Sequence, residues 1–195
     1  MSARATPLVQ IINKLGRPRT ALILTVLEFA VLIVVNGLDF PLSVPYQHRV
    51  TGQGYLDFCN YCSAAAVQSQ VDALGVQGRL LQALLLSTID VLIPMLSCLF
   101  GIAALAALTR QWRAGGSSIG WLLAIPVFAM LLDFGENWSI VGLLIRYPSP
   151  SPFLAGLEGL LSGLKVTAYA LVAVSIVILL AVNAVLRPHT VEVQS

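Results

Sequence analysis

The chain has 195 residues, of which 57 % are hydrophobic and 10 % are charged, and its formal net charge is +2. Soluble domains carry about 25 % charged residues, so this composition excludes an ordinary soluble domain and indicates a membrane protein of one domain. The small net charge gives no reason to expect a nucleic-acid partner.

The N-terminal half begins with a mixed, basic arm at 1–19, in which the stretch 7–15 has the apolar spacing of a short interfacial helix. The first apolar segment follows at about 20–38. It is too long for the core of a signal peptide and no small-residue cleavage site follows it, so we expect a retained span. Residues 39–78 predict a long loop, and its second half, from Ser63 to Leu74, is expected to form a short helix before a glycine stop.

Two further apolar segments follow this loop. The second span is predicted at about 80–108, where Pro94 should kink the helix because proline cannot donate a backbone hydrogen bond. A short basic loop separates it from the third span, at about 119–145. The proline-rich stretch 147–152 then ends the third helix.

The fourth span is expected at about 154–186, and a polar tail follows at 187–195. Lysine and arginine are densest in the arm 1–19 and in the loop between the second and third spans. The positive-inside rule therefore places both termini in the cytoplasm, with the protein in the cell inner (plasma) membrane. The predicted fold class is all-α: an integral membrane bundle of four transmembrane helices over 20–186, with a short extra helix in the first outer loop.

Charged residues lie inside all four apolar segments. A charge at the centre of a bilayer costs roughly 2.5–3.5 kcal/mol on insertion scales, so such residues need a structural or functional reason. Counted from the outer ends of the spans at about 1.5 Å per residue, all of them lie roughly 15–20 Å deep, which predicts one polar layer. The residues are Glu28, Asp90, Asp133, Glu136 and Lys165.

The third span carries the densest part of this layer. Asp133, Glu136 and Asn137 stand at positions i, i+3 and i+4, so they share one face of the helix, and Trp138 follows directly. Such a face should turn away from lipid, toward the interior of the bundle or toward a cavity.

Several interpretations of the layer are open. In a structural one, Lys165 and Asn137 pair with the acids and hold the helices together. In a binding function, the layer takes a lipid-like or small polar ligand through Glu28, Asn137, Trp138 and Lys165. An intramembrane enzyme acting on a lipid or isoprenoid would use acid catalysis, with candidate catalytic groups Asp133, Glu136 and Asp90.

Other classes of protein are kept as alternatives. A proton-coupled transporter or an assembly subunit of a larger membrane complex would also need buried charges, and a homo-oligomer is compatible with the sequence. Neither histidine lies in a span and no metal-binding motif is present, so we expect no metal and no cofactor. Membrane lipids are the expected partners.

The sequence Cys59-Asn-Tyr-Cys62 places a CxxC motif in the predicted first outer loop. In an oxidising compartment such a pair forms a disulfide or takes part in redox chemistry. Together with four spans and cytoplasmic termini, the motif resembles the DsbB family of quinone-linked thiol oxidases, which would imply a thiol oxidoreductase. That family uses a second cysteine pair, which the second outer loop lacks here. An incidental pair or a local disulfide is the other interpretation.

Three stretches of the chain resemble a group of uncharacterised four-span bacterial integral membrane proteins. This resemblance covers about 20–186 and implies the four-span fold without implying an activity. Its motif positions here would be Asp90, Pro94, Asp133, Glu136 and Asn137, and the cysteines would not belong to the motif. The stretches are 61–63 with 73–79, then 89–94, then 132–137.

Overall fold

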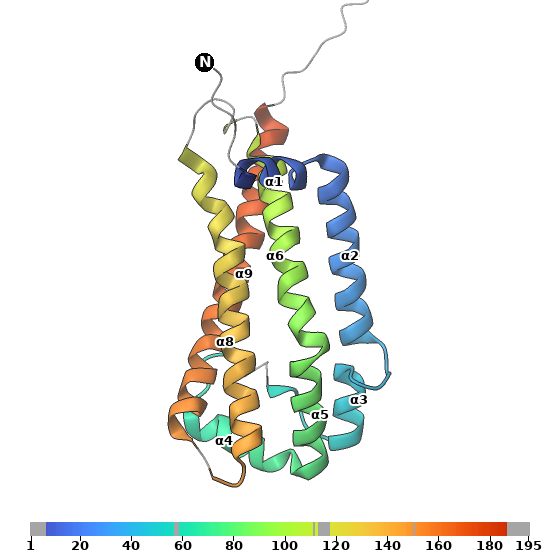
Figure 1. Ribbon diagram of the computed structural model, residues 1–195, viewed down its shortest axis with the longest axis vertical. Helices are drawn as coiled ribbons and strands as arrows, with labels where there is room; N and C mark the ends of the chain where they lie inside the picture. The colour runs from blue at the N-terminus through green and yellow to red at the C-terminus, as the bar shows by residue number, and fades with distance from the viewer. Residues whose placement is uncertain (1–6, 57–58, 111, 113–117, 150, 187–195) are drawn as a thin grey trace, which may run out of the picture.

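The computed structural model of the protein describes residues 7–56, 59–110, 112, 118–149 and 151–186. It is all-helical, with 86 % helix and no strand in this described part, which confirms the predicted class. Four helices are long and apolar enough to cross a membrane, and they lie side by side (Figure 1), indicating a multi-pass membrane protein. The start of the arm and the tail at 187–195, which the sequence predicts to be cytoplasmic, lie outside the described residues.

The helices follow one another with short connections. Those able to span a membrane are α2, the continuous pair α5 and α6, α8 with the 3-10 turn η2 before it, and α9. In chain order the elements are α1 (Pro7–Leu15), α2 (Pro18–Gly37), α3 (Val44–Thr51), α4 (Ala64–Ala73), α5 (Gly75–Ser87), α6 (Ile89–Leu108), η2 (Ser118–Leu123), α8 (Ala124–Arg146) and α9 (Pro152–Leu186).

The second span is longer than the sequence predicts, and its helix has an interruption that the sequence does not predict. It begins at Gly75, whose φ of +64° turns the chain from α4 straight into α5, a conformation that favours glycine. The helix is interrupted at Thr88, whereas Pro94, where the sequence predicts a kink, lies inside α6. Pro94 is the sixth residue of α6, so its ring removes the helical hydrogen bond to the Asp90 carbonyl.

The region predicted to be a loop holds two helices. In α4, Ser63 caps the N-terminus by accepting a hydrogen bond from the Ala66 amide at 3.3 Å. The other helix, α3, is absent from the sequence prediction. It begins with the same kind of serine cap, because the Ser43 hydroxyl accepts a hydrogen bond from the Tyr46 amide at 3.2 Å. Gly52, in the left-handed region, ends the helix. Both helices lie at the end of the molecule opposite α1, which crosses the other end against α6 (Figure 1).

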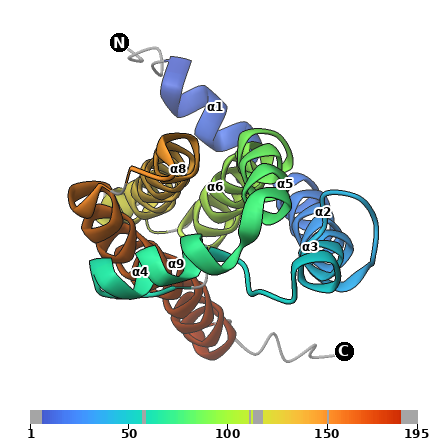
Figure 2. The ribbon, with the colours of Figure 1, turned by 90° about the horizontal axis from the view of Figure 1, so that it is seen from below.

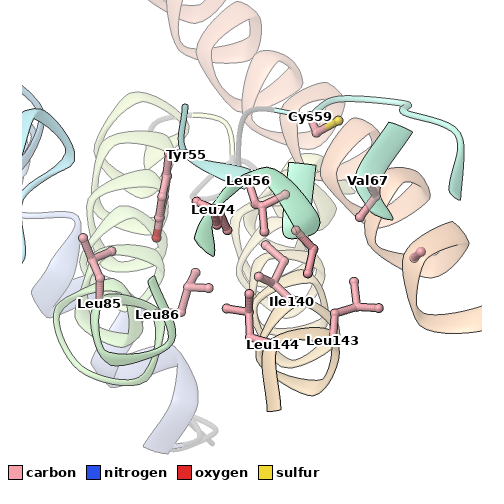
Figure 3. Packing of buried hydrophobic residues seen from close by; sticks show 12 residues of the cluster. Tyr55, Leu56, Cys59, Val67, Leu74, Leu85, Leu86, Ile140, Leu143 and Leu144 are labelled. Atoms are coloured by element: carbon pink, nitrogen blue, oxygen red, sulfur yellow. The ribbon is translucent and has the colours of Figure 1, made fainter. Parts of the chain in front are cut away.

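The main hydrophobic cluster lies at the α3 and α4 end rather than at mid-height. Figure 3 shows Leu56 and Leu74 packed against Ile140 and Leu144 of α8. Full burial of such a side chain contributes about 1.5–3 kcal/mol, so this cluster anchors the segment after α3 to the long helices.

The helices do not pack evenly around the molecule. Helices α8 and α9 have the most extensive contact, and α2 rests mainly on α6 while making little contact with α9. Figure 2 shows α2 and α8 on opposite sides of α6. The space between α2 and α9 is therefore not filled by another helix of the described chain.

The segment with the cysteines packs against α9 over two glycines. The Tyr61 amide donates to the Gly159 carbonyl at 3.0 Å, and the Tyr61 hydroxyl lies 2.8 Å from the Thr167 Oγ1. A Cβ at Gly159 would overlap the Cys62 backbone, and one at Gly163 would overlap the Tyr61 ring. Gly159 and Gly163 therefore allow a loop to pack closely against α9 at this point.

This contact predicts opposite results for two glycines one turn apart. Gly159→Ala should lower the free energy of unfolding by about 1–3 kcal/mol, because the added methyl group must displace the Cys62 backbone. Gly156→Ala is the matched control, because no atom lies within 4 Å of a Cβ at Gly156. Thermal unfolding of both variants in one mild detergent measures the difference, and equal melting temperatures would contradict the close packing of this loop.

Candidate functional site

A cavity of about 890 Å³ lies between α2, α6 and α9. Most of its lining is apolar and comes from these three helices, with a contribution from α8. Its polar lining is a small set drawn from five separate parts of the chain: Thr25, Glu28, Asn60, Ser97, Asp133, Lys165 and Tyr169.

Glu28 of α2 lines the cavity, and its side chain contacts α6. The Ser97 hydroxyl donates to Glu28 Oε1 at 2.5 Å, and the glutamate is only 5 % exposed. Its other oxygen, Oε2, is buried and has no hydrogen-bond partner among the described residues. Glu28 therefore holds α2 to α6 through one oxygen and leaves the second oxygen as an acceptor.

Lys165 of α9 forms an ion pair with Glu136 of α8. The Lys165 Nζ and Glu136 Oε2 atoms are 2.5 Å apart, and the two side chains are 6 % and 0 % exposed. Buried charges of this kind are retained when each has a partner of opposite sign, since an uncompensated charge in a low-dielectric interior is very costly.

The remaining acids of the predicted layer also meet partners on neighbouring helices. The Tyr169 hydroxyl donates to Asp133 Oδ2 at 3.0 Å, and the Asn137 amide donates to Asp90 Oδ2 at 2.8 Å. Each acid of the layer thus contacts a polar or basic group of another helix, as the structural interpretation of the layer expects.

The predicted site residues divide into two groups. Glu28, Asp133 and Lys165 line the same cavity, a relation that depth along the helices could not establish. The others lie outside it. Asn137 and Trp138 line a separate groove of about 310 Å³ beside α5, where Trp138 is 78 % exposed. Asp90 and Glu136 are buried between helices and are not part of the cavity lining.

Sequence reasoning missed a polar face on α9. Glu158 and Ser162 are fully buried there, and Tyr169 joins them on the side of α9 that carries Lys165. The spacing i, i+4, i+7 and i+11 of these four residues is the periodicity of one helical face, so the signal was present in the sequence. Asn60 carried no such signal, because it reaches the cavity from a loop.

Cys59 and Cys62 form a disulfide, with their Cα atoms 5.4 Å apart. It closes the loop that carries Asn60, whose side-chain oxygen accepts a hydrogen bond from Ser162 Oγ at 3.0 Å. The third cysteine, Cys98, is buried in α6 and stands outside this pair. The arrangement matches a local disulfide that positions a loop, and the thiol-oxidase alternative stays a prediction.

Within the described ranges, no three His, Cys, Asp or Glu residues lie close enough to hold a metal ion. Chemically the site offers the carboxyl groups of Glu28 and Asp133 and the ammonium group of Lys165 at one end of a mostly apolar cavity.

No protein-family model, curated protein or solved structure matches this chain. The resemblance to four-span bacterial membrane proteins therefore stays a prediction.

The buried ion pair gives a prediction on stability. Lys165→Met alone should lower the free energy of unfolding by about 3–5 kcal/mol, because it leaves Glu136 buried without its cation. Combining it with Glu136→Gln should recover most of that loss, since the second change removes the charge. Melting temperatures of the wild type, both single variants and the double variant test this. Additive losses in the double variant would show that the two residues do not act as a pair.

Proposed function

We propose that this chain binds one amphiphilic, lipid-like molecule in the cavity between α2, α6 and α9. The observation that carries the proposal is the uneven lining of the cavity. Its charged groups, Glu28, Asp133 and Lys165, lie at one end. The lining toward α1 is apolar except for Thr25, whose hydroxyl donates to the Ala21 carbonyl of its own helix. A molecule with a polar head and an apolar tail matches this division.

The apolar part of the cavity has the length of an acyl or isoprenoid chain. On α2 it extends from Glu28 to Pro18, ten residues or about 15 Å of helix. On α9 the lining from Tyr169 to Leu180 runs alongside this stretch, toward the same end of the molecule (Figure 1). The total volume, about 890 Å³, lies in the range of small-molecule sites, which is roughly 300–1,000 Å³.

The sides of the cavity support entry from the membrane. Helices α2 and α9 make little contact, and apolar side chains on both flanks are exposed, among them Leu22, Phe29 and Val177. In a bilayer these side chains would contact acyl chains. A lipid-like molecule could then enter between the two helices without crossing an aqueous phase.

The proposal includes an arrangement in the membrane. We place the four spans as one bundle in the bacterial inner membrane, with both termini cytoplasmic and the disulfide loop outside. The lysine and arginine residues of the arm and of the loop between α6 and α8 support this orientation. Helix α1 would lie in the cytoplasmic interface, because it crosses the ends of the spans (Figure 1).

Filling the apolar part of the cavity tests the function. Ala104 of α6 lines the cavity and is partly buried, so Ala104→Phe should occupy the space of the tail. Ala30→Phe is the matched control, because Ala30 is exposed on α2 and does not line the cavity. Mass spectrometry of molecules that co-purify in mild detergent should show one amphiphile that is retained by the wild type and the control.

The amount of this amphiphile that co-purifies with Ala104→Phe should be at least tenfold lower than with the wild type. If the wild type and both variants carry the same set of bound lipids in the same amounts, the cavity does not bind a lipid-like ligand.

A further inference from the structure

Carboxyl groups outnumber cations in the interior of this protein. Among the described residues, five carboxyl side chains are buried and Lys165 is the one buried lysine. Lys165 forms its ion pair with Glu136, on the α8 side of the cavity. Two of these five acids, Glu28 and Asp133, line the cavity itself. The interior thus has a surplus of acids next to a space that can hold a ligand.

Among the buried acids, Glu28 has the surroundings that most favour binding of a ligand. Its recorded hydrogen bond comes from Ser97, a neutral hydroxyl, and reaches only Oε1. The other oxygen is buried without a partner in the described part of the chain, and the residue belongs to the cavity lining. A buried acceptor left without a donor destabilises the folded protein, and more so when the group is charged. A donor on the ligand would remove this cost.

Resting on the proposed binding function, we infer that the ligand is an amphiphilic amine whose ammonium group donates a hydrogen bond to Glu28 Oε2. A hydroxyl could satisfy the same oxygen, but only a cation also offsets the surplus of acids. Hydrogen bonds between ionised groups are roughly twice as strong as neutral ones, and a water-poor interior strengthens them further. An anionic head group is disfavoured, because Glu28 and Asp133 would face it, while Lys165, the cation of the described lining, already forms an ion pair with Glu136.

The experiment compares two probes that differ only in the head group: dodecylamine, which is an ammonium ion at pH 7, and dodecanol. Native mass spectrometry of the full chain released from mild detergent counts bound probe molecules directly. The wild type should bind dodecylamine at least tenfold more tightly than dodecanol. Equal affinities would overturn the inference and leave the binding function in place.

Glu28→Gln isolates the oxygen in question. The glutamine carbonyl can still accept from Ser97, while an NH₂ group replaces Oε2 and presents a donor where the acceptor was. The preference for dodecylamine should therefore vanish in Glu28→Gln. Glu158→Gln is the matched control, because it also converts a fully buried carboxyl to an amide but lies outside the cavity lining.

A preference for dodecylamine that survives in Glu28→Gln, or that is lost equally in Glu158→Gln, would overturn the role of Glu28. If Glu28→Gln does not fold, the two probes on the wild type still give the answer. Binding of neither probe to the wild type, with no effect of Ala104→Phe on co-purified lipids, would overturn the proposed function itself.

Discussion

The ion pair between Lys165 and Glu136 is the interaction on which the interior of this protein depends. A charged lysine in the middle of an apolar span is costly, and an opposite charge beside it offsets part of that cost. The pair joins α9 to α8, and these two helices have the most extensive contact in the structure. It also sets the rotation of α9. Residues two turns before and one turn after Lys165 must then turn inward with it.

That rotation explains the other contacts of α9. Tyr169, one turn further on, reaches Asp133 of the same partner helix, and Ser162 reaches Asn60 of the disulfide loop. Gly159 lies beside this face and admits the backbone of Cys62. The loop with the CxxC motif thus packs where the polar face of α9 and its glycines coincide. The disulfide shortens that loop and gives Asn60 a defined place at the edge of the cavity.

Helix α2 is attached by a different kind of contact. It rests on α6, with the Ser97 to Glu28 hydrogen bond between them, and makes little contact with α9. Helix α9 packs mainly on α8, and helix α2 packs mainly on α6. A cavity therefore remains between these two pairs of helices. The acids of the layer therefore differ in their surroundings. Asp90 and Glu136 are enclosed by helix contacts, whereas Glu28 and Asp133 also face the cavity.

Much of this architecture follows from local features of the sequence. The four spans and the all-α class could be predicted because apolar segments of sufficient length are a property of the chain alone, whatever its neighbours. The serine caps of α3 and α4 are also local, and α3 was missed although its signal, Ser43 followed by Pro45, is present. The spacing from Glu158 to Tyr169 likewise contained the polar face of α9.

The choice of partner for each buried charge was decided only by the tertiary structure. Depth along a helix follows from counting residues, and it placed Glu28, Asp133 and Lys165 at one level. Rotation about the helix axis depends on how all the helices pack, so no count along one segment can separate the cavity-lining Asp133 from the enclosed Glu136, three residues away. Asn60 shows the same limit, because a loop residue reaches the cavity through contacts with α9 that lie about a hundred residues further along the chain.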